Sequence, residues 1–112
     1  MNYVKKAKEF VILLIDSETS TEQVKCLIGT ASLTQLNAIS EILYNLLHGD
    51  IKLNRDIAIK VKRHKKILQE ICDQENSFSS RLSLIRKHIK LAASILSGSA
   101  LEVRKIIKQD GK

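Results

Sequence analysis

The chain contains no proline and no tryptophan, and aromatic residues make up only 4% of its 112 residues. The absence of proline removes the residue that interrupts helices most strongly. The aromatic side chains are Tyr3, Phe10, Tyr44 and Phe78, too few for a groove of rings on which single-stranded bases stack. The core must therefore be built from Leu, Ile, Val and Ala. With an apolar content of 44%, the chain is also too hydrophobic to be a disordered basic tail.

Cysteine is scarce as well. Cys26 and Cys72 both fall at apolar positions of helical patterns, which predicts free thiols in the core. A disulfide between them would require a secreted protein, and no feature of the sequence indicates secretion. His48, His64 and His88 are not spaced with the cysteines as zinc ligands are, so we expect no metal site and no cofactor.

Long hydrophobic runs and catalytic motifs are missing too. The apolar run from Phe10 to Ile15 is six residues long, too short to cross a bilayer and shorter than the apolar part of a signal peptide. The chain is therefore expected to be cytoplasmic or nuclear, and not secreted. It has no HExxH motif, no glycine-rich phosphate loop and no GxSxG motif. We predict no catalytic residues and no enzymatic activity.

A helical pattern extends along the whole chain. Leu36, Ile39 and Leu43 recur at three-four spacing, and no segment alternates as a strand does. We predict one all-α domain over residues 1–112, a compact bundle of five to six short helices. The predicted helices are 3–15, 21–28, 33–48, 55–72, 80–97 and 100–109. Helix 80–97 carries apolar residues on most of its circumference and is expected to be central.

Local signals mark the expected helix ends. Capping boxes of the form Ser-x-x-Gln or Ser-x-x-Glu are predicted at Ser20, Ser32 and Ser99. The four glycines, at positions 29, 49, 98 and 111, each follow an apolar run, where a left-handed helix C-terminus favours glycine. The predicted connections are short, so neighbouring helices are expected to pack together.

Positive charge is concentrated in one segment. Residues 52–90 contain eleven basic and four acidic residues, a net charge of 11 − 4 = +7, which equals the net charge of the whole chain. The flanking segments, 1–51 and 91–112, contain eight basic and eight acidic residues and sum to zero. A localised cationic surface on a small domain indicates contact with phosphate groups.

Helix 55–72 is predicted to carry this surface. At helical spacing its apolar residues, from Ile57 to Ile71, share one arc together with His64. The opposite arc holds the predicted nucleic-acid-binding residues Arg55, Lys60, Lys62, Arg63, Lys65 and Lys66. Arg86, Lys87 and Lys90 extend this set if helices 55–72 and 80–97 pack antiparallel.

The residue types favour contact with the nucleic-acid backbone over base readout. Lysine outnumbers arginine in the central run and acts as a point charge, so binding is expected to depend on salt and little on sequence. Asn54 or Arg55, at the start of the helix, could reach a base edge. Three other interpretations stay open: a solvated face that only aids solubility, an acidic protein partner, and an anionic membrane surface. The membrane ranks last because the bundle needs the apolar face of this helix for its core.

Three motifs at fixed spacing carry a resemblance. They read Ala38-Ile39-Ser40-Glu41-Ile42, then Asn45-Leu46-Leu47-x-Gly49-Asp50-Ile51-x-Leu53, then Lys62-Arg63-His64-Lys65-Lys66-x-Leu68. Over residues 27–87 the chain resembles small basic proteins of adenovirus-like mobile elements, the Maverick/Polinton and adintovirus group. The resemblance implies a virion-core or DNA-associated protein, with a nuclear or virion location. The chain lacks the second, denser basic run and the Gly-Gly tail of that family.

We therefore predict a non-enzymatic, virion-core-like or packaging protein that binds the phosphates of double-stranded DNA, with capsid or another protein as a further partner and no membrane. The alternative is a helical interaction module whose basic face meets an acidic protein. An exposed apolar patch beside that face, formed by Phe10, Leu13 and Tyr44, would favour the alternative.

Overall fold

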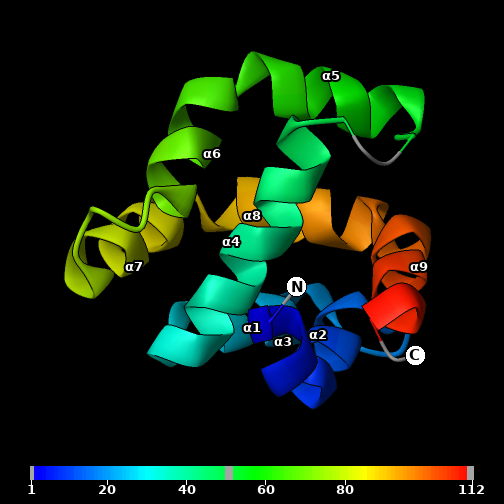
Figure 1. Ribbon diagram of the computed structural model, residues 1–112, viewed down its shortest axis with the longest axis horizontal. Helices are drawn as coiled ribbons and strands as arrows, with labels where there is room; N and C mark the ends of the chain where they lie inside the picture. The colour runs from blue at the N-terminus through cyan, green and yellow to red at the C-terminus, as the bar shows by residue number, and fades with distance from the viewer. Residues whose placement is uncertain (1, 50–51, 111–112) are drawn as a thin grey trace.

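The computed structural model describes residues 2–49 and 52–110, with side chains as far as Lys108. All regular structure within these residues is helical, which confirms the predicted all-α class (Figure 1). The helices are α1 (Asn2–Lys6), α2 (Lys8–Ile15), α3 (Thr21–Gly29), α4 (Leu33–Leu47), α5 (Arg55–Arg63), α6 (Lys65–Cys72), α7 (Phe78–Lys87), α8 (Ile89–Gly98) and α9 (Ala100–Asp110). They form a body of 32 × 28 × 27 Å.

The predicted number of five to six helices was wrong for the described part of the chain, because single residues divide three of them. Ala7, His64 and His88 each have φ near −110°, with ψ of 30°, 23° and 36°. The hydrophobic period continues through a one-residue break, so the sequence pattern does not reveal it. At His64 the consequence is large, since α5 and α6 meet at a sharp corner (Figure 1).

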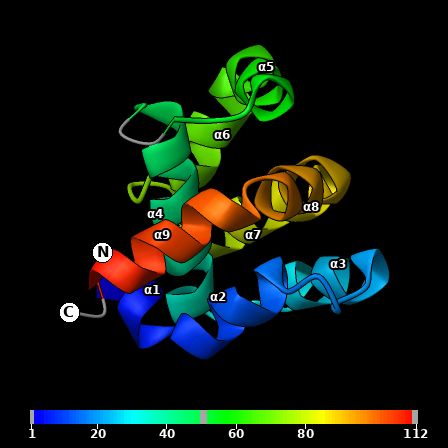
Figure 2. The ribbon, with the colours of Figure 1, turned by 90° about the vertical axis from the view of Figure 1, so that its right-hand side faces the viewer.

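Two helices organise the core. α4 contacts α1, α2, α5 and α6, and its side chains Leu36, Ile39 and Leu43 are fully buried. α8 lies between α2 and α3 on one side and α5 on the other (Figure 2). The central position predicted for helix 80–97 therefore applies to its second half, whereas α7 lies at the edge of the bundle (Figure 1).

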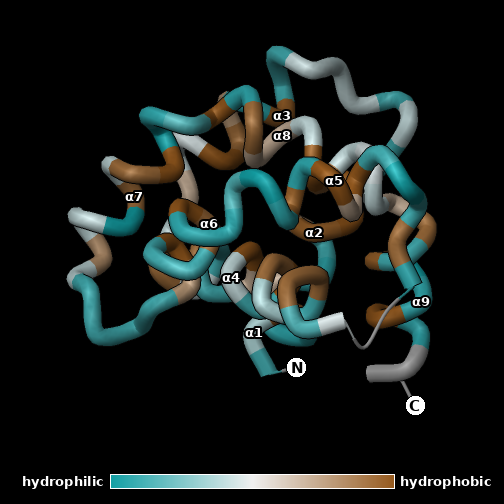
Figure 3. Tube along the Cα trace, turned by 90° about the horizontal axis from the view of Figure 1, so that it is seen from above, coloured by the Kyte–Doolittle hydropathy of each residue, from teal (hydrophilic) through white to brown (hydrophobic). Residues whose placement is uncertain are grey.

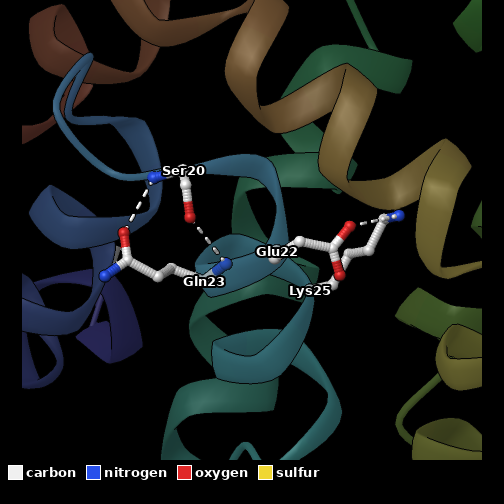
Figure 4. A network of polar contacts seen from close by, with 4 residues as sticks. All are labelled: Ser20, Glu22, Gln23 and Lys25. Atoms are coloured by element: carbon white, nitrogen blue, oxygen red, sulfur yellow. Dashed lines mark hydrogen bonds and ion pairs between the residues drawn. The ribbon is translucent and has the colours of Figure 1, made fainter.

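Two of the three predicted capping boxes are present. The Ser20 hydroxyl accepts from the Gln23 backbone N–H at 3.2 Å, and the Gln23 side chain accepts from the Ser20 N–H at 2.8 Å (Figure 4). Ser32 and Gln35 repeat this arrangement at the start of α4. The box predicted at Ser99 was wrong, because the buried Ser99 hydroxyl donates to the Ile95 carbonyl at 2.7 Å. Only one residue separates α8 from α9, so α9 has no free end to cap.

The glycines were also only partly anticipated. Gly49, after α4, has a φ of +75° as predicted, and it is the one described glycine with positive φ. Gly98 is needed for a different reason, namely the close approach of α5 to α8. A Cβ at Gly98 would lie 2.9 Å from Cγ1 of the buried Ile57 and closer still to its Cδ1. Gly111 lies outside the described residues.

Candidate nucleic-acid interface

α5 and α6 are amphipathic helices whose inner faces belong to the core. Ile57, Val61, Leu68 and Ile71 are buried. α5 packs against α4 and α8, and α6 packs against α4 and α7. Hydrophobic and hydrophilic residues alternate along both helices at the helical period (Figure 3). The predicted basic residues on these helices are all exposed: Arg55, Lys60, Lys62, Arg63, Lys65 and Lys66. We call these six side chains the basic corner.

The break at His64 gives the basic corner its shape. Arg63 ends α5 and Lys65 begins α6, so the densest run of cations surrounds the vertex (Figure 1). His64 itself is half-buried at this vertex. The cations therefore project from a convex corner of two helices rather than from one straight face. A convex surface of this kind meets the outside of a polyanion and does not enclose a small ligand.

α7 and α8 pack antiparallel to α5 and α6. The Asn54 amide donates to the Gly98 carbonyl at 3.2 Å, and the Arg81 Nε donates to the Ile71 carbonyl at 2.9 Å. Between these contacts, the Lys60 ammonium donates to the Ser94 hydroxyl. Lys90 is exposed one helical turn before Ser94, and so lies on the same side of α8.

The antiparallel packing brings some predicted residues to the corner and removes others. Lys90 adjoins it, and Lys87 is exposed one turn earlier. Arg86 is directed elsewhere: its Nε donates to the Gly29 carbonyl at 2.7 Å, at the end of α3. α3 lies on the side of α8 away from α5 (Figure 2). Asn54 is also occupied, because its side-chain oxygen caps α5 by accepting from the Ile57 N–H at 3.0 Å.

Within the described residues, no carboxylate forms an ion pair with a cation of the corner. Among the described residues the one ion pair joins Lys25 to Glu22 at 3.3 Å, far along the chain on α3 (Figure 4). Six like charges on two adjoining short helices repel one another. Such repulsion is relieved when a polyanion binds.

One apolar side chain lies among these cations and was not anticipated. Ile59 is 45% exposed on α5, four residues after Arg55 and four before Arg63, and so between them on the helix surface. The apolar patch considered from the sequence does not form there. Phe10 is buried. Leu13 on α2 and Tyr44 on α4 are both exposed, and the Tyr44 ring contacts His48 with centroids 4.1 Å apart.

Arg81, one of the eleven basic residues counted in the charged segment, is not a surface cation. It is 3% exposed, and its Nη2 donates to the Ser40 hydroxyl at 2.7 Å. Its bond to the Ile71 carbonyl places the positive charge at the C-terminal end of α6, where the helix dipole favours a cation. Burial lowers the pKa of Arg81, and nearby Cys72 and Asp73 partly offset this effect. Arg81 thereby ties α7 to α6 and α4, and so supports the helix that forms one arm of the corner.

The two cysteines differ in a way that the sequence did not predict. Cys26 is exposed rather than buried, whereas Cys72 is half-buried and its thiol donates to the Ser40 carbonyl at 3.3 Å. Burial raises the pKa of Cys72 from 9.0 to about 12, although Arg81 opposes the shift.

We expect a thiol reagent at about pH 8 to modify Cys26 at least about 100-fold faster than Cys72, because reaction requires an exposed thiolate. Mass spectrometry after timed quenching, with Cys26→Ser as control, measures both rates. Equal rates for the two thiols would contradict the assigned burial.

Above pH 9.0 the unfolded chain ionises Cys72 before the folded chain does, so this residue's contribution to stability falls between pH 9.0 and about 12.

Comparison with known protein families, with curated proteins and with solved structures finds no match to this chain. Among the described residues, no group of three His, Cys, Asp or Glu side chains is arranged to hold a metal ion. Nor does this part of the chain contain a helix of the length and apolar character needed to cross a bilayer.

Proposed function

We propose that this chain is a non-enzymatic nucleic-acid-associated protein that binds the phosphates of double-stranded DNA through the basic corner. One observation carries the proposal. Six exposed cations, without an ion pair in the described part of the chain, project from two helices whose opposite faces are anchored in the core. Cations that neutralise phosphates release the counterions condensed on the nucleic-acid backbone, and this release favours binding.

The same geometry supports binding that is independent of sequence. Reading of base edges requires side chains that enter a groove and form paired hydrogen bonds. Asn54, the amide at the start of α5, is occupied by the α5 cap and by Gly98. Four of the six cations in the basic corner are lysines, which act as point charges.

The resemblance to basic proteins of adenovirus-like elements supports a role in packaging, in the nucleus or the virion, with capsid as a further partner. The matching segment Lys62-Arg63-His64-Lys65-Lys66 surrounds the vertex at which α5 meets α6.

An acidic protein partner is the second candidate, and Ile59 is the observation that favours it. Protein interfaces gain most of their affinity from a few buried anchors. An exposed isoleucine between Arg55 and Arg63 could serve as such an anchor, with the cations around it meeting acidic residues of the partner.

A salt series tests the proposal. Affinity for two duplexes of unrelated sequence is measured by fluorescence anisotropy between about 50 and about 200 mM salt. With five to six phosphate contacts, the logarithm of the affinity should fall with the logarithm of the salt concentration with a slope of about −5. The two duplexes should bind within about threefold of each other, since phosphate contacts carry no sequence information.

Ile59→Ala is the matched variant, because it leaves every charge in place. Phosphate binding predicts unchanged duplex affinity for this variant. Failure to bind either duplex at about 50 mM salt, or a slope near zero, would refute phosphate binding and leave the acidic partner as the candidate.

A further inference from the structure

The fold gathers a second group of cations at the end of the molecule opposite the basic corner. The segments that contribute them have no net charge in the sequence. In the structure α9 packs against α1 and α2, so that residues from both ends of the chain lie together (Figures 1 and 2). The exposed lysines there are Lys5, Lys6, Lys8, Lys105 and Lys108, which we call the terminal basic surface.

Three acids of the same segments lie away from these lysines. Asp16 and Glu18 lie in the connection from α2 to α3, and Glu22 on α3 is paired with Lys25. Glu9 is exposed beside the terminal lysines, whereas Glu41 and Glu102 are half-buried, and the Glu41 carboxylate accepts from the Val4 N–H at 2.8 Å. Tertiary packing thus separates part of the charge that cancels along the sequence.

These lysines are available for an anion. None of them forms an ion pair in the described part of the chain. Lys6 lies over the Tyr3 ring, 5.7 Å from its centroid, a contact that leaves its ammonium exposed on one side. Lys5, Lys6 and Lys8 also line an open cleft, together with Glu9 and with Ser32 and Gln35 at the start of α4.

The two basic surfaces face away from each other. The cleft with the terminal lysines lies at the first turn of α4, whereas α5 packs near the other end of that helix (Figure 1). α4 has 15 residues, which corresponds to about 22 Å at about 1.5 Å per residue. α8 lies between α5 and α2, so the body of the protein separates the two surfaces (Figure 2).

A single duplex does not reach both surfaces. DNA has a persistence length of about 50 nm, many times the 32 Å length of this protein. A duplex bound at the basic corner therefore stays nearly straight and leaves the terminal basic surface open.

We propose that the terminal basic surface is a second phosphate-binding surface, through which one copy of the chain bridges two DNA duplexes. The inference rests on the proposed function, which assigns the first duplex to the basic corner. Bridging follows from two cationic surfaces on opposite sides of a rigid body, without a second copy of the chain. Because the terminal surface has lysines that are spread over three helices, it should be the weaker of the two.

A two-duplex capture assay tests bridging. One duplex is immobilised, a second carries a fluorophore, and the protein is added at low salt. The decisive variant changes Lys5, Lys6, Lys8, Lys105 and Lys108 to Gln, and its control changes the same five residues to Arg. Thermal melts confirm that both variants fold.

We expect the Gln variant to capture at least about 10-fold less of the second duplex, while its affinity for one duplex falls less than about fivefold. The Arg variant should bridge like the unmodified protein. Capture by the Gln variant at the unmodified level would overturn the inference. Bridging would then arise from two associated copies of the chain, each of which binds one duplex through its basic corner. If the Gln variant lost single-duplex affinity and capture of the second duplex to the same extent, the inference would also be overturned. The two groups of cations would then act as one extended surface for a single duplex.

The assay separates this inference from the proposed function. If the unmodified protein binds no duplex at all, the proposed function fails. If it binds one duplex with the expected salt dependence but captures no second duplex, only the bridging inference fails.

Discussion

The variant with Lys62, Arg63, Lys65 and Lys66 all changed to Glu is expected to bind a random duplex at about 50 mM salt about 100-fold more weakly or worse. These four residues surround the vertex between α5 and α6, and all are exposed. For each phosphate contact that is lost, fewer counterions are released on binding, and each introduced carboxylate repels the phosphate backbone of the DNA. The residual binding should therefore have a much shallower salt dependence. Anisotropy titrations at several salt concentrations measure both effects.

Substitution of Lys62, Lys65 and Lys66 by Arg provides the matched control. It preserves the charge, so its affinity should stay within about threefold of that of the unmodified chain. The four side chains point to solvent, hence neither variant should lose helical content by circular dichroism. If the Glu variant bound duplex as tightly as the unmodified chain, the basic corner would not be the interface.

Arg81→Ala is expected to lower the free energy of unfolding by about 3 kcal/mol, since it leaves a cavity and removes two buried hydrogen bonds. The lost partners are the Ile71 carbonyl at the end of α6 and the Ser40 hydroxyl on α4. For a domain of this size such a loss lowers the melting temperature by about 10–15 °C. Thermal and urea denaturation followed by circular dichroism test this value.

Two further substitutions separate the causes. Arg81→Met keeps most of the volume and removes a charge that is costly to bury, so it should cost no more than about half as much as Arg81→Ala. Lys87→Ala, at an exposed position of the same helix, should change stability by less than about 0.5 kcal/mol. If the Arg81→Ala protein had the same melting temperature as the unmodified chain, the buried guanidinium would not hold α6 to α7.

The hydrophobic period predicted most of the local structure correctly. The helical class, the segments that form helices, the boxes at Ser20 and Ser32 and the exposed position of the basic residues on α5 and α6 all depend on near neighbours along the chain. The breaks at Ala7, His64 and His88 were missed, because one residue in a bridge-region conformation leaves the apolar arc nearly intact.

The uses of individual polar groups were harder to predict. Ser99 and Gly98 matched helix-end patterns, yet one bonds back into α8 and the other accommodates Ile57. Arg81 and Arg86 counted equally toward the basic segment. The structure buries one beneath α6 and directs the other to the end of α3, because each finds a backbone carbonyl that only the tertiary packing supplies.

The sequence alone determined that this protein is helical and that helix 55–72 has one basic and one apolar side, because both properties repeat every few residues. Only the tertiary structure decided that the basic side bends into a corner, that Lys90 adjoins it and Arg86 does not, and that lysines from the two ends of the chain meet. Those outcomes depend on which helices pack together, and the distances involved are set by contacts between residues far apart in the sequence. Charge that cancels along the chain can therefore separate in space, and the terminal basic surface of this protein arises in that way, whereas the basic corner is already marked by the net charge of its own segment.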